Sequence, residues 1–113
     1  MATRQSTVDF ILEQIEQAGA VSARKMFGEY ALYCDGRVVA LVCDDQLYVK
    51  PTQAGQDFIG QVVQGHPYPG AKPYFLISGD WWDEPGWLAQ LVRVSAAELP
   101  LAQKRPARKA RKK

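Results

Sequence analysis

The sequence has few of the side chains on which catalytic and metal sites most often depend. It contains a single histidine, His66, and two cysteines, Cys34 and Cys43. Two cysteines are too few for a disulfide framework, and these two lack the close spacing of zinc ligands. A catalytic set of the Ser-His-Asp or Cys-His type would have to be built around His66, which sits in a Gly-His-Pro loop. We therefore expect no catalytic residues, no metal, no cofactor and two free, largely buried thiols.

Long apolar runs and glycine-rich phosphate loops are absent as well. No run approaches the roughly 18 apolar residues of a membrane span, and the stretch MATRQSTVDF lacks the apolar core of a signal peptide. Gly28 and Gly36 belong to a predicted strand and a hairpin turn, so neither opens a helix after a strand, as phosphate-binding loops require. We expect a soluble, cytoplasmic protein without membrane contacts.

The residues that are present give an ordinary globular composition with an uneven distribution of charge. Hydrophobic residues make up 47% of the 113 residues and charged residues 23%, which excludes wholesale disorder and suffices for one core. The net charge of +2 conceals a body, residues 1–103, with seven basic and 12 acidic side chains, hence a net charge of −5. We predict a folded domain over residues 1–100 and a disordered basic tail over residues 101–113.

The tail carries the other seven basic residues and no acidic one. Such runs attract phosphate backbones without reading sequence. Two interpretations of the tail therefore stay open. Either it contacts nucleic acid without sequence specificity, or it is a solvated terminus without a specific use. Membrane-surface binding has no support, because no lipidation signal or amphipathic basic helix accompanies the charges. The candidate nucleic-acid-binding residues are Lys104, Arg105, Arg108, Lys109, Arg111, Lys112 and Lys113.

The densest β-forming run of the chain lies between Arg24 and Lys50. Asp35-Gly36 suits a two-residue type I′ turn, which needs positive φ at both central positions. Asp44-Asp45 is a second, weaker turn signal. Together they predict an antiparallel meander of three strands: Arg24–Cys34, Arg37–Cys43 and Gln46–Lys50.

The Asp35-Gly36 turn also predicts which side chains share a face of the sheet. On one face the pairs are Cys34 with Arg37, Leu32 with Val39 and Tyr30 with Leu41. On the other they are Tyr33 with Val38 and Ala31 with Ala40. Both faces are largely apolar, and helices of the same chain can bury only one of them. The other is either a partly exposed apolar face or a patch covered by a second copy or a partner.

Helical spacing of apolar residues predicts three helices around these strands. The first is capped by Ser6 or Thr7 and closed by Gly19, the second runs from a Thr52 cap to about Gln64, and the third begins near Asp83 and stops by Pro100. Their apolar faces hold Val8, Phe10, Ile11, Leu12, Ile15 and Ala18; Phe58, Ile59, Val62 and Val63; and Trp87, Leu88, Leu91, Val92 and Val94.

The second and third helices are separated by a loop rich in glycine and proline and by two further predicted strands. The loop covers residues 65–73, and the strands are Tyr74–Ser78 and Trp81–Asp83. The order is therefore α-β-β-β-α-β-β-α. It predicts an α+β fold of two layers, an antiparallel sheet with helices on one face.

The strand region carries a motif similar to that of a known family. Arg24-Lys25-Met26-Phe27-Gly28-Glu29-Tyr30 precedes Leu32-Tyr33, the Asp35-Gly36 turn, Ala40-Leu41-Val42 and Leu47-Tyr48-Val49-Lys50. From about Val8 to Val94 the chain resembles the N-terminal domain of the TfoX/Sxy competence regulators. Full-length regulators of this family continue into a second, helical domain, whereas this chain passes Pro100 into the basic tail.

The resemblance implies a bacterial, cytoplasmic, non-enzymatic regulatory domain with a two-layer fold and a protein partner. That partner belongs to the transcription machinery, since the regulators work with the catabolite activator protein at competence promoters. The resemblance also implies an interaction role for the motif residues, in a monomer or a homodimer. These residues are Arg24, Lys25, Met26, Phe27, Gly28 and Tyr30.

A second interpretation is a small-ligand-binding protein or an enzyme that uses the His66 loop and the Trp81-Trp82 region. Sugar-binding sites often combine a pair of carboxylates with an aromatic platform. A similar combination is offered here by the two tryptophans and the nearby Asp80, Asp83 and Glu84. A cleft and a perturbed titratable group near these residues would favour this interpretation.

Overall fold

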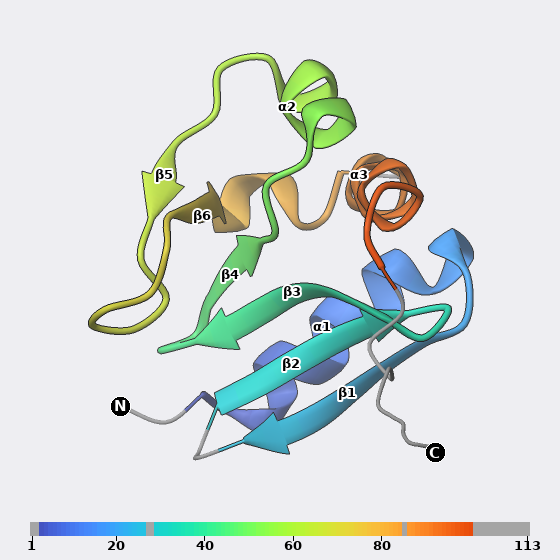
Figure 1. Cartoon of the computed structure of the whole chain (residues 1–113). Helices are drawn as coiled ribbons and strands as arrows, with labels where there is room; N and C mark the ends of the chain where they lie inside the picture. The colour runs from blue at the N-terminus through green and yellow to red at the C-terminus, as the bar shows by residue number, and fades with distance from the viewer. Residues whose placement is uncertain (1–2, 27–28, 85, 101–113) are drawn as a thin grey trace, which may run out of the picture.

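A computed structural model describes residues 3–26, 29–84 and 86–100, which form an α+β fold built on one antiparallel sheet (Figure 1). The sheet has the strand order β1-β2-β3-β4-β6-β5, and α1 lies across one face of it. The prediction of an antiparallel sheet with helices on one face is confirmed. The elements are α1 (Gln5–Ile15), η1 (Glu16–Ala18), β1 (Val21–Met26), β2 (Glu29–Cys34), β3 (Arg37–Cys43), β4 (Gln46–Val49), α2 (Gln53–Ile59), β5 (Gln64–Gly65), β6 (Tyr74–Ile77), η2 (Gly79–Trp81) and α3 (Trp87–Ala96).

The predicted order of strands needs three corrections. The single strand expected over Arg24–Cys34 is two strands, β1 and β2, which pair antiparallel with Met26 opposite Glu29. A short strand, β5, lies inside the stretch expected as helix and loop. The strand expected at Trp81–Asp83 is wrong, because Gly79–Trp81 forms a 3-10 turn capped by the hydroxyl of Ser78.

Both predicted two-residue turns of the meander are present. Asp35 and Gly36 have φ of 53° and 81°, as a type I′ turn requires. Asp44 and Asp45, with φ of 54° and 60°, adopt the same region without a glycine. Hydrogen bonds from Asp44 N to Glu29 at 3.0 Å and from Asp45 N to Thr3 Oγ1 at 3.3 Å hold the second turn.

The register of the first predicted hairpin is correct only next to the turn. Cys34 lies opposite Arg37 and Tyr33 opposite Val38, but a bulge then places Leu32 opposite Ala40 instead of Val39. Val39 is the extra residue of the bulge. The side chains of Val39 and Ala40 both belong to the core between the sheet and the helices. Tyr30 consequently pairs with Val42, and Leu41 lies on the outer face of the sheet, where it packs with Ala31 and Tyr48.

The main core fills the space between the sheet and the helices. α1 contributes Val8, Ile11 and Ile15, and α3 contributes Leu88 and Leu91. Phe10, which was expected in this core, is 39% exposed. The N-terminal cap of α1 is also different from the prediction, since the backbone of Arg4 occupies the cap position without a capping side chain.

Helix α2 begins at the predicted cap but is shorter than expected. The Gly55 amide donates to Thr52 Oγ1 at 2.9 Å, and the Glu98 carboxylate accepts from the amides of Gln53 and Ala54 at 3.0 and 3.2 Å. The helix ends at Ile59 because Gly60 adopts a positive φ of 87°, which favours glycine and cannot continue a right-handed helix. Val63, predicted on its apolar face, therefore lies beyond the helix and is 61% exposed.

Close packing of α2 on α3 explains the other glycine of α2. A Cβ at Gly55 would stand 2.8 Å from Thr52 Oγ1 and 3.0 Å from Ser95 Oγ of α3. The helices therefore approach each other through two small residues, Gly55 and Ser95. Two further bonds fix α3 and the segment after it: Arg93 donates to the Gln17 carbonyl at 2.7 Å, and Arg37 Nε donates to the Leu99 carbonyl at 2.9 Å.

Candidate functional site

The outer face of the sheet carries a second apolar cluster that contains no helical residue. Ala31, Leu41, Cys43 and Tyr48 are buried there, and partly buried side chains surround them: Tyr33, Val38, Tyr74 and Leu76. Residues 66–73, which connect β5 to β6, include the buried Pro67. Side chains of the same chain thus bury the centre of this face, while its margin stays partly exposed. Its cover by a second copy or a partner stays a prediction.

A cleft of about 440 Å³ opens at the end of this outer face. Two large apolar side chains of this cleft are exposed, Met26 of β1 by 40% and Tyr68 by 55%. We call this feature the outer-face cleft; its lining is Met26, Glu29, Tyr30, Leu41, Cys43, Pro67 and Tyr68. Exposed apolar side chains around a concave apolar surface are typical of a binding site.

The thiol of Cys43, which lines the outer-face cleft, has low reactivity. Burial raises the pKa of Cys43 to about 11, and the carboxylates of Glu29 and Asp44 add to the rise. Burial also raises the pKa of Cys34. Since the thiolate is the reactive form, both thiols are poor nucleophiles at neutral pH. At neutral pH Cys43 therefore lines the cleft as a protonated thiol.

The residues of the Arg24–Tyr30 motif take up different positions. Arg24 lies opposite Ala31 and Lys25 opposite Tyr30, so these two exposed cations point to opposite faces of the edge strand β1. Met26 lines the outer-face cleft. Phe27 and Gly28 lie outside the described residues, as do the seven basic residues of the tail.

Tyr30, the last residue of that motif, belongs to the core. It is 7% exposed, packs in the helix-side cluster and donates its hydroxyl to Gln5 Oε1 of α1 at 2.8 Å. It also contributes to the lining of the outer-face cleft. Tyr30 therefore connects the cleft to the packing of α1. Among the motif residues that the structure describes, Met26 is the exposed one that lines the cleft.

A polar network around Asp45, which local sequence patterns do not reveal, fixes the N-terminal segment to the β3–β4 turn. The Asp45 carboxylate accepts from the Arg4 amide at 2.9 Å, from Arg4 Nε at 3.1 Å and from the Thr7 hydroxyl at 3.0 Å. The Thr3 hydroxyl bonds to Glu29 and to the Val42 carbonyl. Only the turn at Asp44-Asp45 was foreseeable, because its partners lie about 40 residues away in the sequence.

The hydrogen bonds to Asp45 predict an acid-dependent contribution to stability. The Arg4 backbone amide, followed by the Thr7 hydroxyl and the Arg4 side chain, lowers the pKa of Asp45 in the folded state despite partial desolvation. Stabilisation is therefore complete above the unfolded pKa of about 3.9 and is lost as the pH falls through the lower folded value. Replacing Asp45→Asn should lower the Tm at pH 7, and the difference from the native chain should shrink below about pH 4.

The measurement is thermal unfolding of both chains at pH 7, 5 and 3. Asn tolerates the positive φ of this position, so the substitution tests the charge and not the turn. A Tm difference that is the same at pH 3 and pH 7 would show that the Asp45 charge does not stabilise the folded chain.

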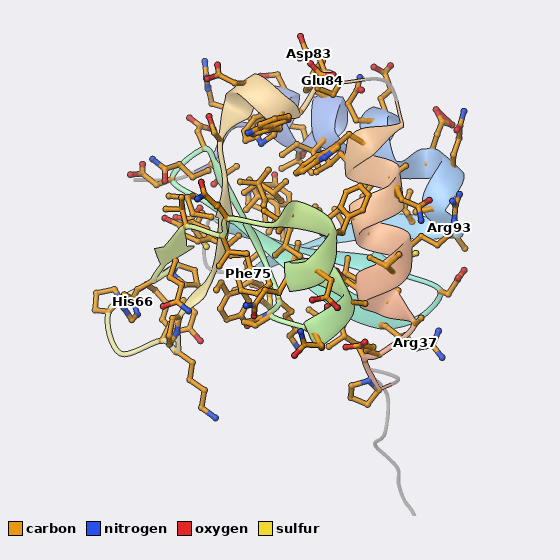
Figure 2. All side chains as sticks on the ribbon, turned by 90° about the horizontal axis from the view of Figure 1, so that it is seen from above. Arg37, His66, Phe75, Asp83, Glu84 and Arg93 are labelled. Carbon is orange, nitrogen blue, oxygen red and sulfur yellow. The ribbon has the colours of Figure 1, made fainter. Side chains whose placement is uncertain are left out.

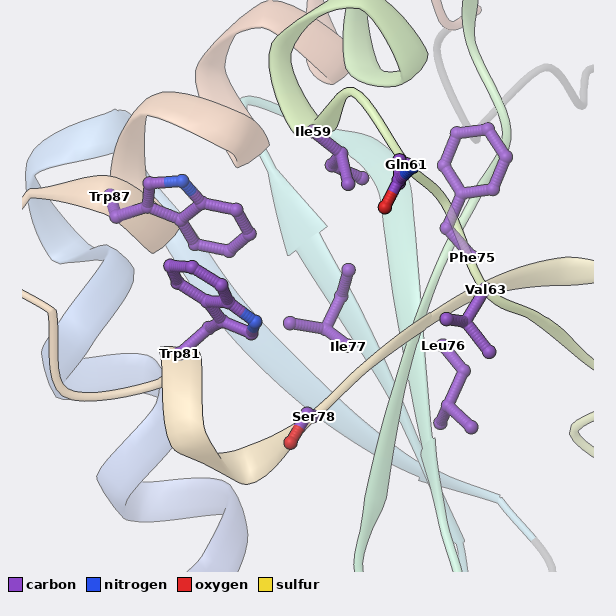
Figure 3. A pocket seen from close by; sticks show the side chains of 9 residues that line it. All are labelled: Ile59, Gln61, Val63, Phe75, Leu76, Ile77, Ser78, Trp81 and Trp87. Atoms are coloured by element: carbon purple, nitrogen blue, oxygen red, sulfur yellow. The ribbon is translucent and has the colours of Figure 1, made fainter.

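A second concave site lies on the helix side of β6, beside two stacked tryptophans (Figure 3). The ring centroids of Trp81 and Trp87 are 5.1 Å apart, and Phe58 lies 5.4 Å from Trp87. The volume of this site is about 360 Å³. We call it the tryptophan pocket; its lining is Ile59, Gln61, Val63, Phe75, Leu76, Ile77, Ser78, Trp81 and Trp87.

The structure does not bring the predicted catalytic candidates together. His66 donates its Nδ1 proton to the Ala71 carbonyl at 2.9 Å and is absent from the lining of the tryptophan pocket. Figure 2 shows it far from Asp83 and Glu84, which are exposed. Trp82 also turns away from this pocket, because its Nε1 donates to the Ile77 carbonyl at 3.1 Å. Of the region proposed for an enzyme or ligand binder, only Trp81 lines the pocket.

Two further findings apply to the described residues alone. Within residues 3–26, 29–84 and 86–100, no group of three or more His, Cys, Asp or Glu side chains is placed to hold a metal ion. In the same part of the chain, every helix is too short or too polar to cross a bilayer.

Comparisons with known proteins agree with the fold and with the motif. The model of the TfoX N-terminal domain family matches residues 13–99. An uncharacterised 12.7 kDa protein encoded in the trpE 5′ region of Spirochaeta aurantia is 43% identical over 108 residues, which cover 96% of this chain and 93% of that protein. The family match includes β1, both walls of the outer-face cleft and the tryptophan pocket.

Proposed function

Because the chain belongs to the TfoX N-terminal domain family, we propose that it is a non-enzymatic regulatory domain that acts by binding other macromolecules in the bacterial cytoplasm. Its role is transcription regulation of the kind that the competence regulators with this domain carry out. The folded body binds a protein partner of the transcription machinery, and the basic tail contacts nucleic acid without reading sequence. The chain acts as a monomer or a homodimer.

The outer-face cleft is the observation that carries the proposal. It joins the motif residue Met26 to Tyr68, and both side chains are exposed although they are large and apolar. Arg24 and Lys25 directly precede Met26 on the edge strand β1 and are exposed as well. An apolar centre with charges beside it is the usual anatomy of a protein–protein interface.

The distribution of charge supports separate roles for the body, which binds protein, and the tail, which contacts phosphate. With a net charge of −5, residues 1–103 repel phosphate, so a phosphate contact falls to the seven basic residues that follow. Phosphate contacts carry no sequence information by themselves. Specificity for a promoter would then come from the protein partner and not from this chain.

A binding measurement with the purified catabolite activator protein of the same bacterium tests the role of the cleft. Met26→Glu with Tyr68→Glu places two charges in the apolar opening and should weaken binding by about 100-fold, as loss of two interface anchors of 1–2 kcal/mol each predicts. Phe10→Glu is the matched control, since Phe10 is 39% exposed on α1 and does not line the cleft.

Calorimetry or fluorescence anisotropy provides the dissociation constants, and thermal unfolding verifies that the variants fold. If the native chain and the double variant bind the activator protein with equal affinity, the cleft is not part of the interface. No affinity of the native chain for the activator protein would reject this partner.

The alternative of an enzyme built on His66 and the Trp81-Trp82 region has no assembled site to support it. His66 is exposed in its loop, and Trp82 is committed to the Ile77 carbonyl. Binding of a small ligand, the other part of that alternative, would involve the residues that line the tryptophan pocket.

A further inference from the structure

The tryptophan pocket combines apolar walls with a few polar groups. Five aliphatic and aromatic side chains besides the two tryptophans line it: Ile59, Val63, Phe75, Leu76 and Ile77. Gln61 and Ser78 are the polar side chains, and Figure 3 shows the indole nitrogen of Trp81 directed toward Ile77 and the cavity. A volume of about 360 Å³ is at the lower end of the range of small-molecule sites.

The polar groups of the pocket have hydrogen-bonding capacity to spare. Trp81 is 48% exposed and Gln61 is exposed as well, so the indole N–H and the side-chain amide are open to solvent and to a ligand. The Ser78 hydroxyl accepts from the Asp80 amide at 3.3 Å, which leaves its own proton free to donate. The neighbouring Trp82, by contrast, has its N–H committed to a carbonyl. The indole N–H of Trp81 can thus donate to an acceptor in the pocket, such as a carbonyl oxygen.

Charge disfavours anionic ligands in this pocket. None of its nine lining residues is ionisable. The segment that carries Trp81 and leads to Trp87 contains the exposed carboxylates of Asp80, Asp83 and Glu84. A phosphate or carboxylate group would find no cation among the lining residues and would meet like charge nearby, so the pocket favours an uncharged ligand.

The tryptophans favour an aromatic ligand over an aliphatic one. Trp81 and Trp87 stack on each other, so their faces are partly occupied and their edges point toward the cavity (Figure 3). The edge of an aromatic ring is its positive part and attracts the π face of another ring. An aliphatic ring of the same size offers no such face.

We propose that the tryptophan pocket binds one small, uncharged aromatic molecule that carries a hydrogen-bond acceptor. Its ring packs against Ile59, Ile77 and the tryptophan edges, and its acceptor meets the indole N–H of Trp81. This site is separate from the outer-face cleft, so the chain has one surface for a macromolecule and another for a small molecule.

Three matched probes test this proposal on the full chain: benzamide, benzoate and cyclohexanecarboxamide. Titration of the ¹⁵N-labelled protein follows the indole N–H signals, and Trp81→Phe assigns the signal of Trp81. Benzamide should shift the Trp81 signal with a dissociation constant on the order of 1 mM or tighter. Benzoate, which adds the charge, should bind about tenfold more weakly, and cyclohexanecarboxamide, which lacks the π face, about threefold more weakly.

A pair of variants tests the donor. Trp81→Phe keeps an aromatic side chain but loses the N–H, and should weaken benzamide about fivefold, as read from the signals of Trp87. Trp82→Phe is the matched control, because Trp82 does not line this pocket and its loss should change the affinity less than twofold. Thermal unfolding confirms that each variant folds.

The proposal fails if benzamide leaves the Trp81 signal unchanged up to about 20 mM, a concentration well above the expected dissociation constant. It also fails if benzoate or cyclohexanecarboxamide binds as tightly as benzamide, or if Trp82→Phe weakens binding as much as Trp81→Phe. None of these results bears on the outer-face cleft, so the proposed regulatory function is tested separately.

Discussion

Removal of the basic tail after Gln103 is expected to abolish the binding of duplex DNA and to leave the Tm of the domain unchanged. The shortened chain carries a net charge of −5 and repels phosphate. The seven basic residues that are lost can neutralise up to about seven phosphates, which corresponds to a log–log salt slope no steeper than about −6. Because a backbone contact carries no sequence information, the full chain should bind unrelated duplexes with similar affinity.

The experiment compares three chains by anisotropy of labelled duplexes between low and physiological salt. They are the full chain, the chain shortened after Gln103, and a chain of full length in which glutamine replaces the seven basic residues. The second and third should behave alike, which separates charge from length. If the shortened chain still binds DNA at physiological salt, the folded domain itself binds DNA and the tail is not required. If the full chain fails to bind even at low salt, the tail has no role in nucleic-acid contact.

The features that were predictable from the sequence are those that neighbouring residues determine. The Asp35-Gly36 turn was predictable because its φ angles suit glycine and aspartate. The cap at Thr52 was predictable because the hydroxyl bonds to an amide three residues later. The core face of α1 was largely foreseen from helical spacing, with Phe10 as the exception. Each of these features depends on a few consecutive residues.

The features that were missed depend on contacts between distant residues. The bulge at Val39 shifts the register of β2 and β3, and no glycine or proline marks it. The boundary between β1 and β2 was missed because the run from Arg24 to Cys34 has no strong turn dipeptide. Helix α2 receives part of its capping from Glu98, more than 40 residues away. Local propensity contains no information about such partners.

The candidate site was predictable only in part, and for the same reason. The motif placed Met26 and Tyr30 among the residues of interest, but their roles differ once Tyr30 lies in the core. Tyr68, which lines the outer-face cleft together with Met26, is about 40 residues away in the sequence and carries no local signal. The second interpretation named the His66 loop and the Trp81-Trp82 region, of which only Trp81 lines the tryptophan pocket, because strand β6 and the turn after it bring Trp81 to Trp87. A site made of several elements needs the topology before its members can be named.

Replacing Tyr30→Asp is expected to remove a large part of the stability of the folded domain. Tyr30 is 7% exposed, lies opposite Val42 and joins β2 to α1 through its bond to Gln5. The variant loses the packing of the ring and buries a carboxylate, at a combined cost of at least about 3 kcal/mol. Domains of this size have about 5–15 kcal/mol of stability in total. The Tm should therefore fall by about 12 °C or more.

The conservative change Tyr30→Phe separates packing from hydrogen bonding. It keeps the ring in the core and loses only the 2.8 Å bond to Gln5 Oε1, so the cost should be about 1 kcal/mol. Thermal and urea unfolding measure both variants beside the native chain. If Tyr30→Asp melts within about 2 °C of the native chain, Tyr30 is not in the core and the assignment of the two sheet faces is wrong. Since Tyr30→Phe leaves the lining of the outer-face cleft apolar, it should also keep its affinity for the protein partner. A loss of that affinity without a loss of stability would make the Tyr30 hydroxyl part of the interface itself.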